Sequence, residues 1–344
     1  WGEITNAQPR GVVWVEYGMP KYQKATHKCQ TCVACASLQS ARSHMSRILI
    51  DCTAAQRAAV MSVTPDGSQY ASMLEECAFQ RACIKRKATG RLATLLSGWS
   101  AKSQEFEDVH TFFRFFDSSR FDRSRGGGGL YVELGALDGV YKSNSFFYQQ
   151  VLGWHGVLVE AALQNFMLLT RNVESGLRHN VSTVHAAACP SPAVLRLPLP
   201  TDYFNESHSP WNARKNRNAM TRASADTGGT DTQAHRPKVS APVLCVSMRT
   251  ILEGAPITAH ARGIDFYSID VEGHELNVVA SHDWQRLPAK VVLIELNRKI
   301  NPEEHGQIRT VLAEQGGLCR FGRSGHSNEL WVDPMYDSKV ALGS

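Results

Sequence analysis

The sequence predicts an α/β fold, in which a mostly parallel sheet has helices on both faces and a Cys-rich, mainly helical region at residues 1–100 precedes it. Two observations favour this fold. From about residue 103, short apolar runs alternate with stretches whose apolar residues recur at helical spacing. The apolar runs are continuous, which is typical of strands buried on both faces of a parallel sheet.

We expect residues 101–344 to form one domain from these elements. The apolar runs predict strands at 130–134, 156–161, 182–189, 243–248, 264–273, 290–297 and 328–334. The helical pattern predicts helices at 103–116, from about Ser143, and at 163–173, 274–284 and 307–316. Residues 206–240 are polar and lack apolar periodicity, which predicts an insertion or a disordered loop.

The first 100 residues are rich in Ala, Ser and Cys. Helical spacing at 41–63 and 70–96 predicts helices, and Pro65-Asp66-Gly67 between them predicts a turn. Six of the nine cysteines lie here, and we treat the other three, Cys189, Cys245 and Cys319, as isolated. The six candidates for disulfide bonds are Cys29, Cys32, Cys35, Cys52, Cys77 and Cys83.

Such a cluster favours three disulfides in an oxidising compartment, with pairings that the sequence leaves open. The alternatives are unpaired buried thiols or a zinc site. Cys29-x-x-Cys32 supplies one pair of zinc ligands, with His27 and His44 nearby, but no second C-x-x-C follows. The triplets that begin at Asn180 and Asn205 match the N-glycosylation pattern and also favour the secretory pathway.

Carboxylates follow most of the predicted strands. These residues are Glu133, Glu160, Asp270, Glu272 and Glu295. Ligands of parallel sheets bind beyond the carboxyl ends of the strands, so we expect these side chains to surround a common site.

The segment from Glu133 to Gly139 turns through Gly135 and Gly139. It lacks the G-x-G-x-x-G pattern and the G-K-[ST] ending of phosphate-binding loops, which disfavours a nicotinamide-dependent oxidoreductase. An acid before a glycine turn instead suits a cofactor with positive charge and no phosphate, such as S-adenosylmethionine (SAM); the alternative is a plain strand-to-helix turn. Glu160 ends the next strand, where an acid can accept hydrogen bonds from both ribose hydroxyls.

Five segments together resemble the FkbM-type SAM-dependent methyltransferases. They are SQEFED (103–108), YVELGALDGVYKSN (131–144), LGWHGVLVEAALQNF (152–166), IDFYSIDVEGHEL (264–276) and KVVLIELN (290–297). The resemblance extends from Ser103 to Asp333 and excludes residues 1–100. It implies a class I methyltransferase fold and methylation of hydroxyl oxygens, including those of sugars.

The resemblance also implies roles for individual residues. Cofactor binding is expected of Glu133, Gly135, Asp138, Gly139, Ser143, Asn144, Glu160 and Ala187, with Ala188 beside the last. Asp270, Glu272 and His274 are expected at the methyl-transfer site, and Glu275, Glu295 and Asn297 near the acceptor. A hydroxyl needs a base to remove its proton as it attacks, and Asp270 is our preferred base because it stands at a strand end.

Some assignments stay open. Two carboxylates and His274 could instead hold a divalent cation, or His274 could simply bond locally at a helix start. Glu295 and Asn297 could contact the acceptor or cap the strand end. The chain has Ala161 to Leu163 where the family often has proline after its ribose acid. A catalytically silent relative that serves as a structural or interaction subunit is therefore the alternative reading.

The expected partner is a glycan or another hydroxylated acceptor, and residues 1–100 could bind a protein. The net charge of +5 is mild and the basic residues are spread out, so no nucleic-acid partner is expected. No stretch is apolar enough to span a membrane, and an anchor is expected only upstream of Trp1. The cysteines and sequons place the protein in the secretory pathway or outside the cell, with an organelle or the cytoplasm as alternatives.

Overall fold

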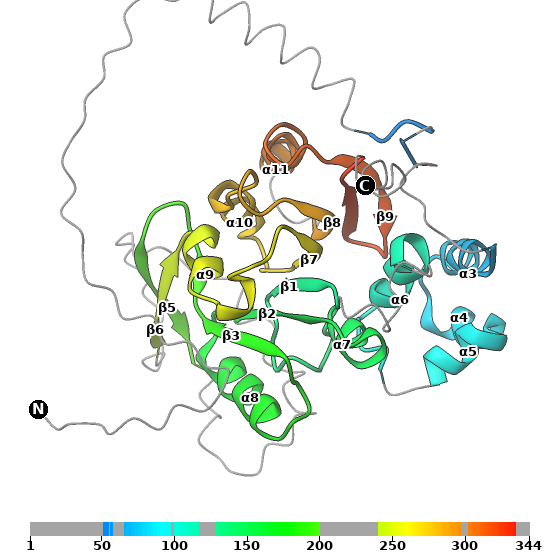
Figure 1. Ribbon diagram of the computed structural model, residues 1–344, viewed down its shortest axis with the longest axis horizontal. Coiled ribbons are helices and arrows are strands. Elements are labelled where there is room, and N and C mark those ends of the chain that lie inside the picture. Colours follow the sequence, from blue (N-terminus) through cyan, green and yellow to red (C-terminus); the bar gives the residue numbers. More distant parts are fainter. Residues whose placement is uncertain are drawn as a thin grey trace, which may run out of the picture.

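The structure is a computed structural model that describes residues 51–54, 56–57, 65–97, 100–116, 128–199, 240–296 and 302–334. The predicted fold class is confirmed: a sheet of seven strands forms the centre, in the order β3-β2-β1-β7-β8-β10-β9 (Figure 1). The strands are β1 (Leu130–Leu134), β2 (His155–Glu160), β3 (Val181–His185), β7 (Ile264–Ile269), β8 (Ala289–Glu295), β9 (Cys319–Ser324) and β10 (Asn328–Val332). The first five are parallel, and β10 is antiparallel to both of its neighbours.

Helices cover both faces of this sheet. One face packs against α6 (Glu107–Thr111), the π-helix η1 (Phe112–Phe116), α7 (Phe146–Leu152) and α8 (Leu163–Glu174). The other face packs against α9 (Met248–Glu253), α10 (Glu275–Ser281) and α11 (Pro302–Glu314), and the short 3-10 helix η6 (Pro256–Thr258) follows α9. Alternate residues of β1 enter the two cores, because successive side chains of a strand point to opposite faces.

A second, smaller sheet corrects one expectation. The predicted strand at 243–248 exists as β6 (Ser240–Val246), but it pairs with β4 (Ala187–Ala188) and β5 (Ala193–Pro198) instead of joining the large sheet. The predicted strand at 182–189 is split between β3 and β4. A disulfide between Cys189 and Cys245 holds the small sheet together, so these two cysteines are not isolated.

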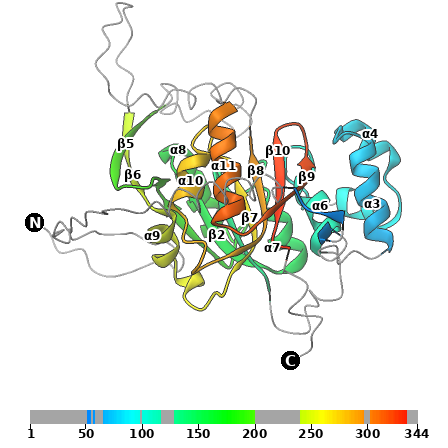
Figure 2. The same ribbon diagram turned by 90° about the horizontal axis from the view of Figure 1, so that it is seen from above.

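The N-terminal region contains α3 (Pro65–Glu76), α4 (Arg81–Lys87) and α5 (Gly90–Ser97). Pro65-Asp66-Gly67 begins α3 and is not a separate turn, since proline is well suited to the first turn of a helix. The predicted helix at 103–116 is shorter than expected, because the chain enters it through the left-handed Phe106 and continues as a π-helix. The helices α3, α4 and α5 lie at one end of the molecule, and the small sheet lies at the opposite end (Figures 1 and 2).

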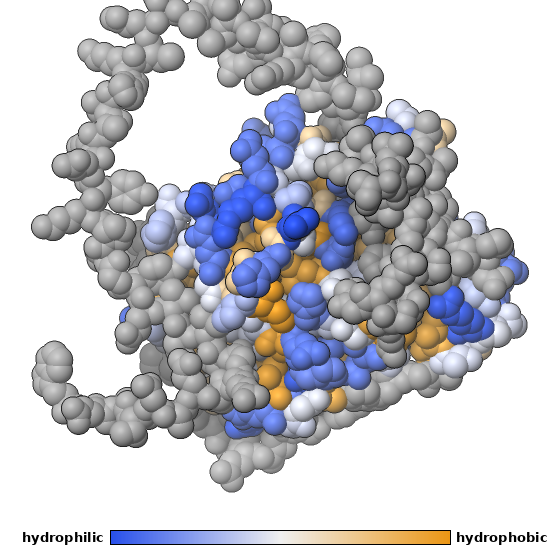
Figure 3. Space-filling view, in the orientation of Figure 1, coloured by the Kyte–Doolittle hydropathy of each residue, from blue (hydrophilic) through white to orange (hydrophobic). Residues whose placement is uncertain are grey.

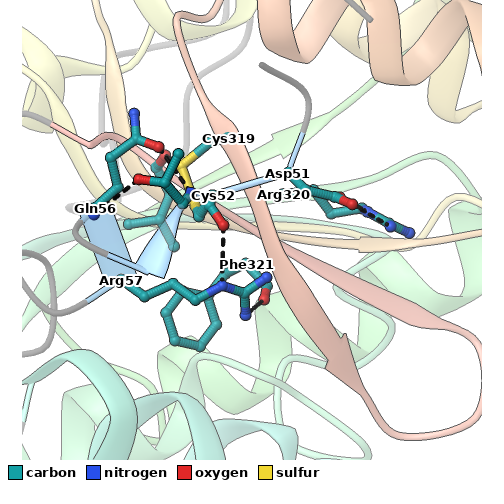
Figure 4. The surroundings of a disulfide bond; sticks show 9 residues. Asp51, Cys52, Gln56, Arg57, Cys319, Arg320 and Phe321 are labelled. Carbon is teal, nitrogen blue, oxygen red and sulfur yellow. Dashed lines mark hydrogen bonds and ion pairs between the residues drawn. A yellow bond between two sulfur atoms is a disulfide. The ribbon is translucent and has the colours of Figure 1, made fainter. Parts of the chain in front are cut away.

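The disulfides differ from the expected N-terminal cluster. Cys77 bonds to Cys83, but Cys52 bonds to Cys319 of β9, 267 residues away in sequence. Around this bond, Arg320 pairs with Asp51 at 2.5 Å and Arg57 Nε donates to the Cys52 carbonyl at 3.1 Å (Figure 4). The N-terminal region is therefore joined covalently to the edge of the large sheet. Cys29, Cys32 and Cys35 lie outside the described residues.

The surface combines polar and apolar areas. On the face seen in Figure 3, hydrophilic side chains border a band of hydrophobic ones. The large hydrophobic side chains most exposed among the described residues are Tyr141, Met167, Val194 and Leu244. In the part of the chain that the structure describes, no helix has the length and apolar character needed to cross a bilayer.

Candidate active site

The carboxyl ends of four parallel strands meet in register at one edge of the large sheet. Leu134 of β1 pairs with Val159 of β2 and with Ile269 of β7. Ile269 in turn pairs with Ile294 of β8, so the residues that follow these four also align across the sheet. We call the aligned positions the strand-end row, which contains in spatial order His185, Glu160, Gly135, Asp270, Glu295 and Asn328.

Gly135 makes a gap in the middle of the strand-end row. Gly135 has no side chain, so only backbone lies in the row between Glu160 and Asp270. The backbones of these two acids lie two strand spacings apart, roughly 10 Å. Glycine is required here because φ is +74° and a Cβ would lie 1.8 Å from the carbonyl oxygen of Asp270. The row therefore has two carboxylates on either side of a position without a side chain.

The loop after β1 uses many of its backbone N–H groups internally. The Gly135 N–H donates to the Val159 carbonyl at 3.0 Å. Asp138 Oδ1 accepts from the N–H groups of Val140 and Tyr141, at 2.8 and 2.6 Å. A diphosphate-binding loop must instead direct free N–H groups at its ligand. This loop therefore suits a cofactor without phosphate better than a dinucleotide.

Glu160 ends β2 with an exposed fraction of only 1%. Its Oε2 accepts from the Leu137 N–H and its Oε1 from the Ala162 N–H, both at 2.8 Å. Burial raises the pKa of Glu160 to about 7, although these hydrogen bonds oppose the shift. Each carboxylate oxygen has a second lone pair. Oε1 also accepts from Asn165 Nδ2 at 3.5 Å, so the side chain is held firmly and Oε2 keeps one lone pair for a further donor.

Glu133 binds the turn that leads into α7. It is 3% exposed, and its Oε1 accepts from the Asn144 N–H at 2.7 Å. Its Oε2 accepts from the hydroxyls of Ser143 and Ser145, at 2.7 and 2.5 Å. Asn144 Nδ2 then donates to Ser268 Oγ at 3.0 Å. Glu133, Ser143 and Asn144, all predicted to bind the cofactor, therefore lie together. Their polar groups hydrogen-bond mainly to one another.

Asp270 and Glu295 are hydrogen-bonded neighbours in the strand-end row. Desolvation raises the pKa of Asp270 to about 7; the charge of Glu272 adds to this shift and the Glu295 hydrogen bond opposes it. Desolvation and the Asp270 charge raise the pKa of Glu295 to about 8. Asp270 itself is nevertheless exposed to solvent. Desolvation and the neighbouring carboxyl groups thus raise the pKa values of both Asp270 and Glu295.

The turn after Asp270 is held by Glu275. Its Oε1 accepts from the N–H groups of Val271 and Gly273, at 3.2 and 3.1 Å. Its Oε2 is buried without a hydrogen-bond partner among the described residues, and burial raises its pKa to about 7. Glu272 adopts φ +55°, a strained conformation for a residue with a side chain.

The remaining predicted residues occupy different surroundings. Glu272 and His274 are exposed, and His274 precedes α10 without a side-chain cap bond. A Cβ on Gly139 would lie 2.5 Å from Leu169 Cδ1, so this glycine permits close packing against α8. Ala187 lies in β4, two residues beyond His185 of the strand-end row. Asn297 lies outside the described residues.

Glu107 of α6 is a site residue that sequence reasoning did not single out. It is 3% exposed, and its charge helps to raise the pKa of Asp270. Its Oε1 accepts from Asn328 Nδ2 at 3.0 Å and its Oε2 from the Glu105 N–H at 2.7 Å. Glu107 lies in SQEFED (103–108), one of the five segments that resemble the methyltransferase family, but the resemblance assigned it no role.

The described residues contain no group of three or more His, Cys, Asp or Glu side chains arranged to hold a metal ion. The divalent cation considered from the sequence thus has no assembled ligand set within these ranges.

Comparison with known proteins identifies one family. The family model described as "Methyltransferase FkbM domain" matches residues 133–318, which is slightly more than half of the chain. The match begins at Glu133 and includes Glu160, Asp270 and Glu295. No curated protein is similar enough in sequence to count as a match.

Several solved structures resemble the chain at low sequence identity. Methyltransferase FkbM from Methylobacillus flagellatus KT is 10% identical, with 78% of this chain and 58% of that chain covered and a TM-score of 0.36. SAH-bound methyltransferase PaMTH1 from Podospora anserina is 9% identical, with 90% and 98% covered and a TM-score of 0.32. The O-methyltransferase NcsB1 from neocarzinostatin biosynthesis, in complex with S-adenosyl-L-homocysteine (SAH) and 1,4-dihydroxy-2-naphthoic acid, is 14% identical, with 78% and 68% covered and a TM-score of 0.27. The chain thus spans less than two thirds of the length of the first of these proteins.

Proposed function

The chain belongs to the FkbM methyltransferase family, and we propose that it is a SAM-dependent O-methyltransferase that acts on a hydroxyl of a glycan or a similar acceptor. The observation that carries this proposal is the strand-end row, in which Glu160 and Asp270 flank the gap at Gly135. We call His185 and Glu160 the cofactor half, and Asp270, Glu295 and Asn328 the acceptor half.

The cofactor half suits SAM by its chemistry. The lone pair that remains on Glu160 Oε2 can accept a hydrogen bond from a ribose hydroxyl. Gly135, Asp138, Gly139, Ser143, Asn144 and Glu133 form the loop and turn beside the gap, and Ala187 lies beyond β3, where we place the adenine. When bound, SAM supplies a methyl group whose bond to the positively charged sulfur breaks as the acceptor oxygen attacks.

The acceptor half supplies the base. Asp270 receives the proton of the acceptor hydroxyl, because it follows β7 directly beside Gly135 in the strand-end row. The pKa of Asp270, about 7, is close to the pH at which a general base works best. Glu295 keeps Asp270 oriented through their hydrogen bond.

The composition of the acceptor half supports a polyol acceptor. Asp270, Glu295 and Glu107 present carboxyl oxygens, which accept hydrogen bonds, and hydroxyl groups are good donors. A sugar carries several adjacent hydroxyls, so it can satisfy more than one of these carboxyl groups while one hydroxyl reacts. An acceptor that carries a carboxylate or a phosphate would meet like charge.

We also place the protein in the secretory pathway or outside the cell. Three disulfides among the described residues support this location, since such bonds persist in oxidising compartments. Asn180 of the first glycosylation triplet is exposed, whereas Asn205 of the second lies outside the described residues.

The test is methyl transfer from radiolabelled SAM to a panel of neutral oligosaccharides, followed by mass spectrometry of the products. We expect label on sugar oxygen with the unmodified chain and none with Asp270→Asn. Methylation of nitrogen or carbon would contradict the O-methyltransferase proposal. Binding of SAM without transfer to any hydroxylated compound would favour the catalytically silent alternative.

A further inference from the structure

Arg178 is a fully buried arginine below the candidate site. It lies between α8 and β3, and its exposed fraction is 0%. Its Nη2 donates to Ser145 Oγ at 2.8 Å and to the Tyr131 hydroxyl at 3.2 Å. The guanidinium carbon lies 5.4 Å from the ring centroids of both Tyr131 and Phe146. Two hydroxyls and two aromatic faces therefore surround this positive charge.

The charge needs a counter-ion, and Glu133 is the carboxylate connected to it. A buried ion without an opposite charge is strongly destabilising. Within the described residues, Nε and Nη1 of Arg178 have no hydrogen-bond partner, so Nη2 alone carries its polar contacts. The acceptor of that contact, Ser145 Oγ, donates in turn to Glu133 Oε2 at 2.5 Å.

Ser145 thus connects the two charges. A hydroxyl has one proton to donate and lone pairs that accept. Ser145 uses its proton toward Glu133 and a lone pair toward Arg178, and it is itself fully buried. The pKa of Tyr131 depends on both groups. Burial raises this pKa to about 12, the Arg178 charge opposes the shift, and the Glu133 charge adds to it.

We propose that Arg178 and Ser145 are positioning residues for the methyl-donor site, and this inference rests on the proposed function. The contact through Ser145 connects Glu133 to the buried guanidinium of Arg178. Glu133 accepts three hydrogen bonds, from Ser143, Asn144 and Ser145. Those bonds hold the turn at the end of the cofactor loop.

A hydrogen bond connects the turn at residues 143–145 to the strand of the acceptor half. Asn144 Nδ2 donates to Ser268 Oγ, and Ser268 lies on β7 two residues before Asp270, on the same face. A chain of buried contacts therefore runs from Arg178 through Ser145, Glu133 and Asn144 to the strand that carries the proposed base. Loss of the bridge should loosen the loop first, because Glu133 then lacks the donor that connects it to Arg178.

The experiment compares Ser145→Ala with Ser145→Thr, which keeps the hydroxyl, and with Ser175→Ala, an exposed serine at the end of α8, as the control. For each we would measure SAM and SAH affinity by calorimetry, the thermal midpoint, and hydrogen exchange in a peptide that covers residues 137–148. Arg178→Met is a further variant. If Arg178→Met does not fold, the two Ser145 variants alone test the proposal.

We expect Ser145→Ala to weaken SAM binding about tenfold, which is the loss of roughly one ordinary hydrogen bond, and to speed exchange at residues 143–146. Ser145→Thr should restore both, and Ser175→Ala should change neither. Equal SAM affinity and exchange in Ser145→Ala and the unmodified protein would overturn the proposal, as would equal losses in the Ala and Thr variants. A lower thermal midpoint with unchanged affinity would show a structural role only. If the unmodified protein binds neither SAM nor SAH, the proposed function fails, and the exchange data still decide whether Ser145 holds the turn.

Discussion

On the cofactor half of the strand-end row, Glu160 accepts two hydrogen bonds from backbone N–H groups, whereas on the acceptor half Asp270 and Glu295 are bonded to each other. The acids occupy aligned positions at the ends of β2, β7 and β8, and desolvation is the largest cause of the raised pKa in all three. Their partners therefore distinguish them. Backbone donors fix Glu160 in place, whereas the partner of Asp270 is a second titratable group.

This difference indicates how one sheet edge can both hold a cofactor and perform chemistry. A residue that positions a ligand needs a fixed geometry, which backbone donors provide. A general base needs a pKa near the working pH, which burial and neighbouring acids provide. The comparison predicts that changes on the two halves affect different measured quantities.

The largest expected effect is the loss of activity in Asp270→Asn. The amide cannot accept the acceptor proton, so we expect methyl transfer to fall by about 10²- to 10⁴-fold, the usual contribution of a general base. SAM affinity should change little, because the cofactor half is untouched. Asp283→Asn, beyond the other end of α10, is the control. If Asp270→Asn abolished SAM binding while Asp283→Asn did not, the division into two halves would be wrong.

A smaller effect concerns the pH dependence. Since Asp270 must be ionised to act, activity should rise as pH increases through about 7. Glu272→Gln removes a charge that raises the pKa of Asp270, so the rise should move to lower pH. Glu295→Ala removes a hydrogen bond that lowers this pKa, so the rise should move to higher pH. Infrared titration of the carboxyl bands gives the same comparison without an acceptor, and shifts in one direction for both variants would refute the assignment.

The smallest expected effect is that of Glu107→Gln. The charge of Glu107 is a weaker cause of the raised Asp270 pKa than that of Glu272. We therefore expect the pH profile to move in the same direction as in Glu272→Gln, but by less. Glu314→Gln, exposed at the end of α11, should leave the profile unchanged. A shift larger than that of Glu272→Gln would mean that α6 contributes more to the acceptor half than the structure indicates.

Much of the fold could be predicted from the sequence because buried parallel strands are continuous apolar runs, as in 130–134 and 290–297. β9 was missed because Cys319–Ser324 places Arg320 and Arg323 among its apolar residues, as an edge strand can. The pairing of Cys52 with Cys319 was also missed. Spacing along the chain carries no information about cysteines that only the tertiary structure brings together.

The candidate site was predictable to a similar extent. Strand ends in a parallel sheet lie at one edge, so Glu160, Asp270 and Glu295 could be grouped before their register was known. Glu107 and Arg178 could not, because they come from segments whose place depends on helix packing. Arg178 in particular lies in an ordinary polar loop of the sequence, and only its burial and its bond to Ser145 distinguish it.

Calorimetric titration of the unmodified protein with SAM and with SAH tests the central claim most directly, with Glu160→Ala measured in parallel. We expect micromolar affinity for both compounds. In Glu160→Ala, the loss of charge-assisted hydrogen bonds to the ribose should weaken affinity by about 10- to 100-fold. Failure of the unmodified protein to bind either compound would contradict the account, and so would full affinity in Glu160→Ala.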